Sequence, residues 1–243
     1  MERNEELTVA QMREAVNKLG SSTERYGDAT LMRFLIARSL DKDKAAKMFV
    51  QWQKWRSDFV PRNCILDSEV EDELSAEKVY LQGLSRKGHP VVLVKGNKHI
   101  SGNDQLQFKK FVVHILDKSI ASAFRGKEIG NEKMTAILDL QQLSYKNIDS
   151  RAMITGFQLL QSYYPERLAK CYLLHMPGFF VRVWKLVSRF LDKATLEKIV
   201  IVTNEEERRE FVRDIGEEAL PEEYGGLAKL ILLQDFKLNP LDH

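Results

Sequence analysis

A chain of 243 residues is long enough for one large domain, or for a small domain beside a medium one. Its composition, with 44% hydrophobic and 30% charged residues, excludes a disordered or fibrous protein. The formal net charge of +2 is too small to indicate a nucleic-acid-binding protein.

The charge is unevenly distributed along the chain. Residues 76–162 carry a net charge of +6 and residues 163–199 carry +4, whereas residues 200–243 carry −6. A basic centre favours the approach of one face of the protein to anions. Scattered, solvated charge gives the same totals, so both interpretations stay open at this point.

Cysteine usage and the first residues bear on the compartment. Cys64 and Cys171 are too few for a disulfide framework and lack the spacing of metal ligands. The sequence therefore predicts no metal site and favours a reduced, cytoplasmic compartment. There is no basic and apolar leader and no apolar run near 18 residues, and Glu2 excludes N-myristoylation. We expect a protein that visits membranes transiently without spanning them.

Residues 1–75 have the pattern of helices. A short helix is expected over residues 7–19, closed by Gly20, and Asp28 is a candidate N-cap for the next one. Asp41 begins the clearest helix, in which apolar residues recur at steps of three and four until Pro61: Ala45, Met48, Phe49, Trp52 and Trp55. We interpret this stripe as core packing.

From Val79 onwards the pattern changes to short apolar runs that alternate with longer helical segments. Two strands, 79–84 and 90–94, flank a tight turn. The later expected elements are a helix over 105–124, a strand over 134–139, a helix over 151–162, a strand over 172–175, a helix over 179–191, a strand over 198–202, a helix over 205–215 and an apolar run over 230–233. This alternation predicts an α/β fold with a partly parallel sheet.

The expected helix over 179–191 is strongly amphipathic. On a helical wheel its apolar residues form one wide face, and Arg182, Lys185 and Arg189 share the opposite side. This pattern is typical of a helix that lies in a membrane interface. It is equally compatible with a core-facing helix that has a solvated basic side.

Catalytic patterns are scarce. The sequence has no G-x-S-x-G, Walker A, G-x-G-x-x-G, H-E-x-x-H or C-x-x-C motif, and its five histidines lack ligand spacing. Asp139 has no partner nearby in the sequence to complete a mechanism, and His175 is interpreted as a hydrogen-bonded core histidine. We therefore expect a protein that is not an enzyme, with no catalytic residues and no cofactor.

Polar residues are set among these apolar elements. Glu166, Arg167 and Lys198 are a possible phosphate site, although a surface salt-bridge cluster explains them equally well. Together with neighbouring motifs they resemble the CRAL-TRIO family, the Sec-fourteen-like lipid-transfer proteins, over about residues 28–233. The residues that carry the resemblance are Leu31–Arg38, Gly88–Val91, Tyr163–Leu168, Phe190–Asp192 and Leu220–Gly226. Several short plant members of the family are similar throughout.

The resemblance implies a helical N-terminal lobe, residues 1–75, packed on a CRAL-TRIO lobe, residues 76–243. The second lobe would contain a mixed, partly parallel sheet, flanking helices and an apolar lipid cavity closed by a gate helix. It further implies that the protein is a monomer that binds one phospholipid, with phosphatidylinositol favoured, and exchanges it with anionic membrane surfaces. No further domain is expected after residue 243.

The resemblance also carries site residues over to this chain. The inositol phosphate head group would be held by Arg38, Glu166, Asp192, Thr195 and Lys198. The gate helix would use Phe179, Phe180, Arg182, Val183, Trp184, Lys185 and Val187. Ser39 departs from the family pattern, where a second basic residue often follows the arginine.

A second head-group site falls on Tyr80, Ser144 and Tyr145, which leaves phosphatidylcholine open as a second ligand. Two other functions remain open. One is a lipid-sensing adaptor that presents inositides to a kinase in phosphoinositide signalling, without bulk transfer. The other is a carrier of an apolar ligand such as a sterol, tocopherol or isoprenoid.

Overall fold

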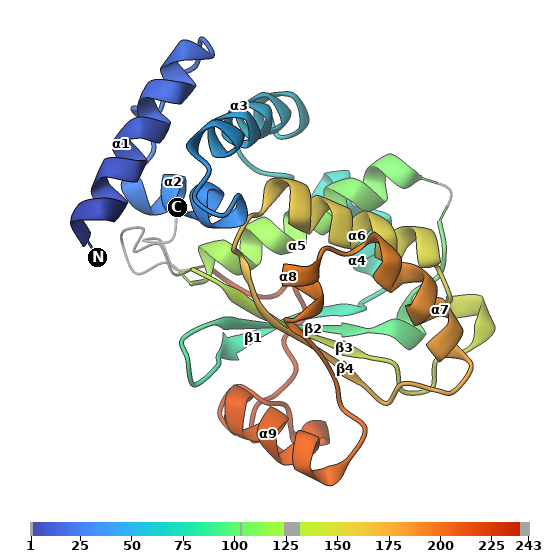
Figure 1. Cartoon of the computed structure of the whole chain (residues 1–243). Coiled ribbons are helices and arrows are strands. Elements are labelled where there is room, and N and C mark those ends of the chain that lie inside the picture. The colour runs from blue at the N-terminus through green and yellow to red at the C-terminus, as the bar shows by residue number, and fades with distance from the viewer. Residues whose placement is uncertain (1, 103, 124–131, 239–243) are drawn as a thin grey trace.

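A five-stranded sheet forms the centre of the larger lobe in the computed structural model, which describes residues 2–102, 104–123 and 132–238 (Figure 1). The strand order is β1-β2-β3-β4-β5, with β1 antiparallel to β2 and all later neighbours parallel. The strands are β1 (Val79–Leu84), β2 (Pro90–Lys95), β3 (Met134–Asp139), β4 (Leu168–Leu174) and β5 (Ile199–Ile201). The expected α/β fold with a mixed, partly parallel sheet is confirmed.

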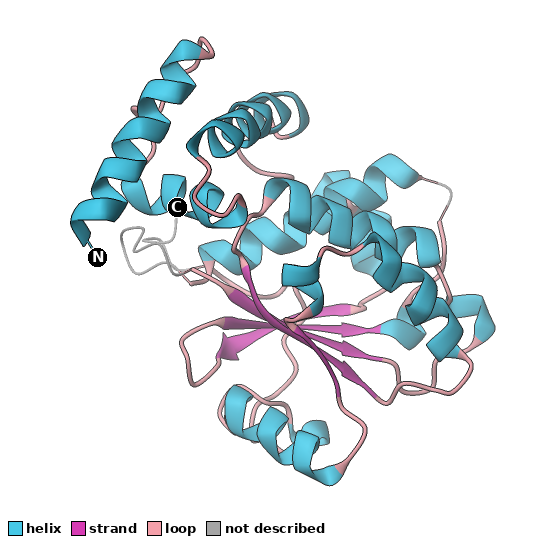
Figure 2. Cartoon of the chain, in the orientation of Figure 1, coloured by secondary structure: helices cyan, strands magenta, loops and turns pink. Residues whose placement is uncertain are grey.

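Helices cover both faces of this sheet, as Figure 2 shows by colour. One face carries α5 (Gln105–Ala121), α6 (Ser150–Tyr163), α7 (Phe180–Val187) and α8 (Lys193–Leu196), and the other carries α9 (Glu205–Ile215). A short helix, α4 (Glu71–Ser75), precedes β1. Short 3-10 turns lie at Asp67–Glu69, Gly96–Lys98, Tyr145–Asn147, Ser188–Phe190 and Glu222–Tyr224.

The sheet separates two apolar cores because side chains alternate along each strand. On β2, Val92 belongs to the core under α5 and α6, whereas Val91 and Leu93 belong to the core under α9. The predicted apolar run at 230–233 lies beside β1, where Leu81 N donates to the Ile231 carbonyl at 3.0 Å. That contact covers an edge of the sheet that would otherwise expose backbone groups.

The N-terminal lobe contains α1 (Glu2–Lys18), α2 (Asp28–Ala37) and α3 (Lys42–Phe59) around a separate apolar core. The predicted start of α3 at Asp41 is confirmed, because Asp41 is its N-cap and the Asp41 carboxylate accepts from Lys44 N at 3.0 Å. The predicted cap at Asp28 is wrong. Its carboxylate turns toward α1 and accepts from Arg13 at 2.6 Å, and Gly27 takes the cap position.

The predicted apolar stripe of α3 serves two different cores. Ala45, Met48 and Phe49 are buried within the N-terminal lobe. Trp55 instead stacks on Tyr163 at the end of α6, with ring centroids 3.9 Å apart and planes 7° apart. The end of α3 therefore belongs to the contact between the lobes.

Arg56 reinforces this contact. Its guanidinium lies 2.8 Å from Asp117 of α5 and donates to Tyr164 Oη at 3.3 Å, and Tyr164 donates to Asp117 at 2.8 Å. Burial raises the pKa of the Asp117 carboxyl, with the Arg56 charge acting in the opposite direction. The predicted division between the lobes at residue 75 stays a prediction. Four residues before that position pack into the core of the sheet: Val60, Ile65, Val70 and Leu74.

In the part of the chain that the structure describes, we find no helix with the length and apolar character needed to cross a bilayer.

The Arg56 network yields a prediction about stability. Arg56→Ala leaves the buried carboxylate of Asp117 without its cation, so we expect a loss of about 2 kcal/mol in the free energy of unfolding. Urea denaturation followed by circular dichroism measures this loss. Lys54→Ala on the same helix removes a highly exposed ion pair to Asp58 and should change the value by less than about 0.5 kcal/mol. Equal effects of the two substitutions would contradict the assigned role of Arg56.

Candidate functional site

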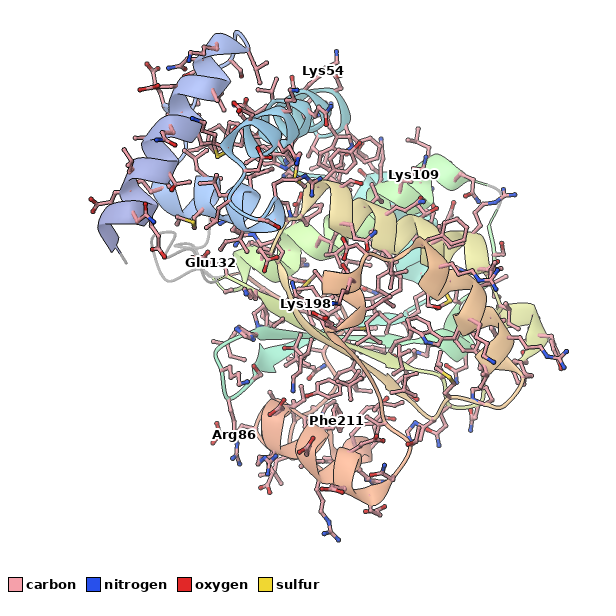
Figure 3. The ribbon with its side chains drawn as sticks, in the orientation of Figure 1. Lys54, Arg86, Lys109, Glu132, Lys198 and Phe211 are labelled. Carbon is pink, nitrogen blue, oxygen red and sulfur yellow. The ribbon has the colours of Figure 1, made fainter. Side chains whose placement is uncertain are left out.

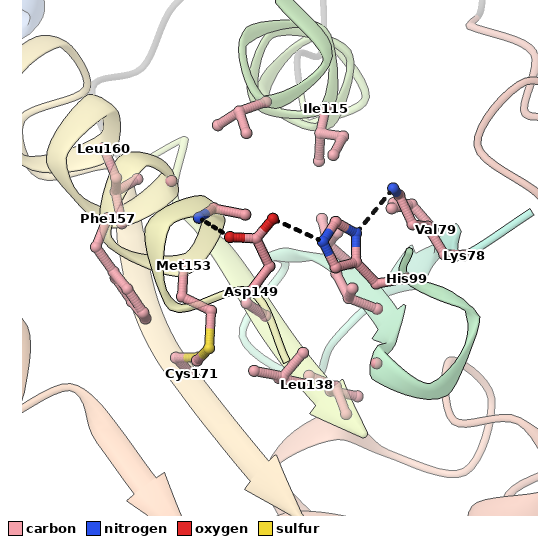
Figure 4. A pocket seen from close by; sticks show the side chains of 18 of the residues that line it. Lys78, Val79, His99, Ile115, Leu138, Asp149, Met153, Phe157, Leu160 and Cys171 are labelled. Atoms are coloured by element: carbon pink, nitrogen blue, oxygen red, sulfur yellow. Dashed lines mark hydrogen bonds and ion pairs between the residues drawn. The ribbon is translucent and has the colours of Figure 1, made fainter. Parts of the chain in front are cut away.

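An apolar cavity of about 270 Å³ lies between the sheet and the helices α5, α6 and α7. Figure 4 shows it from close by, with Ile115 of α5, Leu138 of β3 and Phe157 of α6 around it. Its apolar lining comes from Val79, Val92, Val94, Phe108, Phe111, Val112, Ile115, Leu116, Met134, Ala136, Ile137, Leu138, Leu140, Leu143, Ala152, Met153, Phe157, Leu160, Leu168, Cys171 and Phe180.

Small residues at facing positions help to leave this space unfilled. Ala136 of β3 and Ala152 of α6 have short side chains. Gly156 of α6 has none, and a Cβ added there would meet no heavy atom within 4 Å. Because protein interiors are normally close-packed, small side chains on opposing walls are a direct cause of a cavity.

A charged cluster lies at the amino-terminal edge of the three parallel strands β3, β4 and β5. Lys133 directly precedes β3, Glu166 lies two residues before β4, and Lys198 directly precedes β5. The Glu166 carboxylate lies 3.7 Å from Lys133 Nζ and 3.4 Å from Lys198 Nζ. We call these three residues the Glu166 cluster. Two ammonium groups share one carboxylate there, so the cluster has a net positive charge that suits a phosphate.

The structure links four of the five predicted head-group residues by contacts. Glu166 pairs with Lys198, which is labelled in Figure 3, and Lys198 N donates to the Thr195 carbonyl at 3.0 Å. Asp192 is the N-cap of α8, and its carboxylate accepts from the backbone N–H of Thr195, a mostly buried residue, at 2.7 Å. Arg38 is exposed at the end of α2, where it donates to the adjacent carbonyl of Ala37.

Two neighbours of the predicted site have different roles from those that the motif indicates. Lys133 was not predicted as a site residue, because it directly precedes β3 and no sequence motif surrounds it. Arg167 is buried and donates to both the backbone carbonyl and the carboxylate of Glu132. Arg167 therefore holds the starts of β3 and β4 together through Glu132, which is labelled in Figure 3.

The predicted gate helix is shorter than residues 179–191. It comprises α7 and the 3-10 turn Ser188–Phe190, which we call the α7 segment. Phe180 and Val187 are buried, and Trp184 meets Phe157 of α6 with ring centroids 6.4 Å apart. The apolar face predicted as continuous is divided. Its members Leu186 and Phe190 are 45% and 47% exposed, and Val181 is 39% exposed.

The basic residues of the α7 segment share this outward side. Arg182, Lys185 and Arg189 are all exposed. Phe179, just before the helix, stacks obliquely on Tyr145, with ring centroids 4.7 Å apart. The segment thus has one side in the cavity wall and another side that presents both apolar and cationic groups to solvent.

The residues carried over for a second head group do not form one site. Tyr80 packs in the core under α9, on the opposite face of the sheet from the cavity, and its hydroxyl accepts from Lys98 at 2.8 Å. Its neighbour Val79 lines the cavity instead. Ser144 donates to Asn147 at 2.6 Å, and Tyr145 is 76% exposed. Alternation of side chains along β1 explains why Tyr80 turns away.

The polar part of the cavity wall was also missed. Lys78, His99 and Asp149 line the cavity among its apolar residues, and dashed lines in Figure 4 join them. They are far apart in the sequence, and each stands alone there. Lys78 directly precedes β1, His99 follows β2 and Asp149 directly precedes α6, so only the folding of these elements brings the three side chains together.

His175 and Asp139 form a separate arrangement. His175 Nδ1 lies 2.8 Å from the Asp139 carboxylate, which also accepts from Tyr224 Oη at 2.6 Å. The predicted hydrogen bond of His175 is confirmed. Its predicted place in the core is wrong, because 43% of its side chain is exposed. Among the described residues we find no group of His, Cys, Asp and Glu that could hold a metal ion.

This chain is similar to known proteins in sequence and in structure. The family described as CRAL/TRIO domain matches residues 74–226. A CRAL-TRIO domain-containing protein of Saccharomyces cerevisiae is 30% identical over 232 residues, covering 85% of this chain and 73% of that protein. The Sec14 cytosolic factor of Schizosaccharomyces pombe is 28% identical over 236 residues, covering 91% and 82%.

A plant relative and a solved structure extend the comparison. The phosphatidylinositol/phosphatidylcholine transfer protein SFH7 of Arabidopsis thaliana is 28% identical over 212 residues, covering 81% of this chain and 39% of that protein. The crystal structure of Sfh5 matches with a TM-score of 0.66 and 20% identity, covering 88% of this chain and 76% of that one. This structural match supports the fold alone.

The cavity wall predicts different reactivities for the two thiols. Burial raises the pKa of Cys171 in the cavity wall to about 12, whereas Cys64 is exposed. The thiolate is the reactive form, so Cys171 should stay unreactive at pH 8. Titration of the folded protein with a disulfide reagent should therefore release one equivalent of thiol quickly, and the second only in guanidinium chloride. Rapid reaction of both thiols would contradict the burial of Cys171 in the cavity wall.

Proposed function

This chain belongs to the CRAL/TRIO domain family, and on that premise we propose that it binds one phospholipid in the apolar cavity and exchanges it with membranes. Phosphatidylinositol is the proposed ligand. The observation that carries the proposal is an apolar cavity with a cationic cluster at the adjoining edge of the sheet. Leu168 lines the cavity two residues after Glu166, the carboxylate at the centre of that cluster. A ligand with acyl chains and a phosphate matches both parts.

The size of the cavity indicates that a wall must move. About 270 Å³ is slightly below the roughly 300–1,000 Å³ of pockets for drug-sized ligands, and a phospholipid is larger than these. The α7 segment is the proposed gate. It covers the cavity with Phe180, and its Trp184 ring meets the Phe157 ring of α6.

The outward side of the α7 segment supports docking on an anionic membrane. Exposed leucine and phenylalanine side chains beside arginines and lysines are typical of interfacial helices. Each basic residue near an anionic surface contributes about 1 kcal/mol to binding. Because each buried CH₂ of an acyl chain contributes about 0.8 kcal/mol, release of the lipid into water is negligible and exchange takes place at the membrane.

In the head-group site, Lys198 and Lys133 would contact the phosphate. Glu166 would accept hydrogen bonds from inositol hydroxyls, since a carboxylate directly beside a phosphate would repel it. Thr195 and Asp192 are proposed as secondary contacts near the start of β5. Arg38 stays a proposed contact that requires the exposed end of α2 to approach the site.

The wider role is also a proposal. The relatives named as cytosolic factors and as a phosphatidylinositol/phosphatidylcholine transfer protein support a cytoplasmic protein of lipid transport rather than an enzyme. Phosphatidylcholine is a candidate second ligand on the same ground. Presentation of the inositide to a kinase would use the same bound state, and we expect a monomer in either case.

The head-group assignment is tested by removing its cation and hydroxyl. The double variant Lys198→Ala, Thr195→Ala should transfer phosphatidylinositol between vesicles at least about tenfold more slowly, because hydrogen bonds to a charged group contribute about 1.5–3 kcal/mol each. Lys193→Ala is the matched control. Lys193 lies on α8 together with Thr195, and its side chain is 91% exposed. Circular dichroism should show that both variants stay folded. Undiminished transfer by the double variant would overturn the assignment.

The gate assignment is tested on the outward side of the α7 segment. Leu186→Asp with Phe190→Asp should reduce association with vesicles containing phosphatidylserine about tenfold, because each side chain loses about 1 kcal/mol or more of apolar burial in the bilayer. Vesicle flotation measures the association. Leu227→Asp, at a leucine that is 69% exposed elsewhere on the protein, is the control. An equal loss in the control would contradict a specific docking surface.

A further inference from the structure

A second pocket, polar where the lipid cavity is apolar, lies on the opposite face of the sheet. It has a volume of about 470 Å³ and is enclosed by α9, the starts of β3 and β4, and the turn between β1 and β2. We call it the α9 pocket. Its charged lining residues are Lys87, Lys133, Lys170 and Asp214. The function proposed above makes no use of this pocket.

The register of the sheet brings the polar side chains of the α9 pocket together. Thr135 of β3 lies beside Val91 of β2 and Lys170 of β4, and Val91 faces the core under α9. Side chains on one face recur at every second residue, so His89 and Lys133 lie on the side of α9 as well. Three neighbouring strands thus present hydrogen-bond donors at one level of the same face.

The turn between β1 and β2 holds Lys87 at the pocket. Ser85 N donates to the His89 carbonyl at 2.7 Å, and Gly88 N donates to the Ser85 carbonyl at 2.8 Å. Gly88 has a φ of +77°, a backbone conformation that a residue without a Cβ adopts readily. Arg86, labelled beside α9 in Figure 3, ties the turn to this helix, because its N–H donates to the Ile215 carbonyl at 3.2 Å. The pocket is therefore arranged before any ligand enters.

The α9 pocket has an excess of positive charge. Its one carboxylate, that of Asp214, is already engaged in an ion pair with Lys170. Lys133 lies 3.7 Å from Glu166, but that carboxylate also pairs with a second lysine of the Glu166 cluster. Lys87 is exposed and forms no ion pair with the residues that the structure describes. Lys87 and Lys133 therefore carry charge that the protein does not fully compensate.

Two neutral groups add further donors. Thr135 is only 5% exposed, yet its hydroxyl forms no hydrogen bond with the described part of the chain. Buried polar groups are normally paired, so an unpaired hydroxyl in a pocket wall points to a ligand. Burial, and then the charges of Lys133 and Lys87, lower the pKa of His89. Its neutral ring donates from one nitrogen.

We propose that the α9 pocket binds the phosphate group of a small, soluble phosphate monoester. Such a group carries a charge of about −1.5 to −2 at neutral pH and has three strong acceptor oxygens. Lys87 and Lys133 supply the opposite charges, and the Thr135 hydroxyl and the His89 ring supply hydrogen bonds. The volume lies within the roughly 300–1,000 Å³ of small-molecule pockets, so it also admits the sugar or polyol that carries the phosphate.

Charge and position favour this ligand over other anions. A carboxylate or a phosphodiester has one negative charge and would leave one of the two ammonium groups uncompensated. A membrane lipid suits the pocket less well, because the α7 segment lies on the opposite face of the sheet from α9, as Figure 1 shows. Docking through the α7 segment therefore directs the other face of the sheet toward the bilayer. A soluble dianion matches both the charge and the position of the pocket.

The test compares two probes that differ by one charge. Glucose 6-phosphate and glucose 6-sulfate are titrated into the full chain at about pH 7.5 by isothermal calorimetry, with inorganic phosphate as the minimal probe. We expect the phosphate ester to bind about tenfold more tightly than the sulfate ester. Lys87→Glu should weaken the binding of glucose 6-phosphate at least about tenfold, and Thr135→Val about fivefold. Lys133 is left unchanged, because it also belongs to the Glu166 cluster.

Lys109→Glu is the matched control for Lys87→Glu. Lys109 is an exposed lysine of α5, on the other face of the sheet, and is labelled in Figure 3. Its reversal makes the same change in net charge and should alter the affinity less than about twofold, because salt screens distant charges. Circular dichroism should show that all variants stay folded. Equal losses in the two variants, equal affinity for the two esters, or no binding of either phosphate probe overturns the proposal.

Two further measurements distinguish the α9 pocket from a lipid site. Flotation with vesicles containing phosphatidic acid, a lipid phosphate monoester, should be unaffected by Lys87→Glu. Phosphatidylinositol transfer, measured without soluble phosphate esters, should also be unchanged in this variant. A defect in either measurement would assign Lys87 to lipid binding and overturn a separate soluble-ligand site. Failure of phosphatidylinositol transfer in the wild-type protein, with glucose 6-phosphate binding intact, would contradict the proposed function alone.

Discussion

The parallel alignment of β3, β4 and β5 is the constraint on which the rest of the molecule depends. Parallel strands must begin at one edge and end at the other, so residues that precede strands meet at one edge and residues that follow them meet at the opposite edge. Lys133, Glu166 and Lys198 are neighbours for this reason. Lys78, His99 and Asp149 meet at the other edge, where the antiparallel β1 contributes Lys78 just before its start.

Between these two edges the cavity exists because one face of the sheet is not filled. Helices α5 and α6 pack over β2, β3 and β4, yet Ala136, Ala152 and Gly156 leave space where larger residues would close it. The opposite face is filled by Phe211 and Ile215 of α9 together with Tyr172 and Tyr224. The same sheet thus has a close-packed side that maintains the fold and a hollow side that is available for a ligand.

The contact between the lobes limits what can move. Trp55 and Arg56 attach α3 to the ends of α5 and α6 through stacked rings and the shared Asp117 carboxylate. Among the residues that the structure describes, the α7 segment forms no salt bridge with α6, and Gln161 of α6 donates to the Phe190 carbonyl at 3.3 Å. Apolar side chains on the outer side of the segment are already exposed. Movement of this segment therefore disturbs fewer buried polar interactions than movement of the N-terminal lobe.

Local patterns in the sequence determined the elements, the fold class, the cap at Asp41 and the amphipathic character of the α7 segment, because these depend on residues within a few positions of one another. Grouping Glu166 with Lys198, 32 residues away, was an open interpretation of the residues themselves, and only the family resemblance favoured a head-group site there. Tertiary structure decided that Tyr80 packs on the face of the sheet opposite the cavity and that Lys133 pairs with Glu166. It also decided that Lys78, His99 and Asp149 meet in the cavity wall. Which face of a strand a residue occupies, and which strand ends meet, depend on register and on contacts between distant segments, and no periodicity within one segment encodes them.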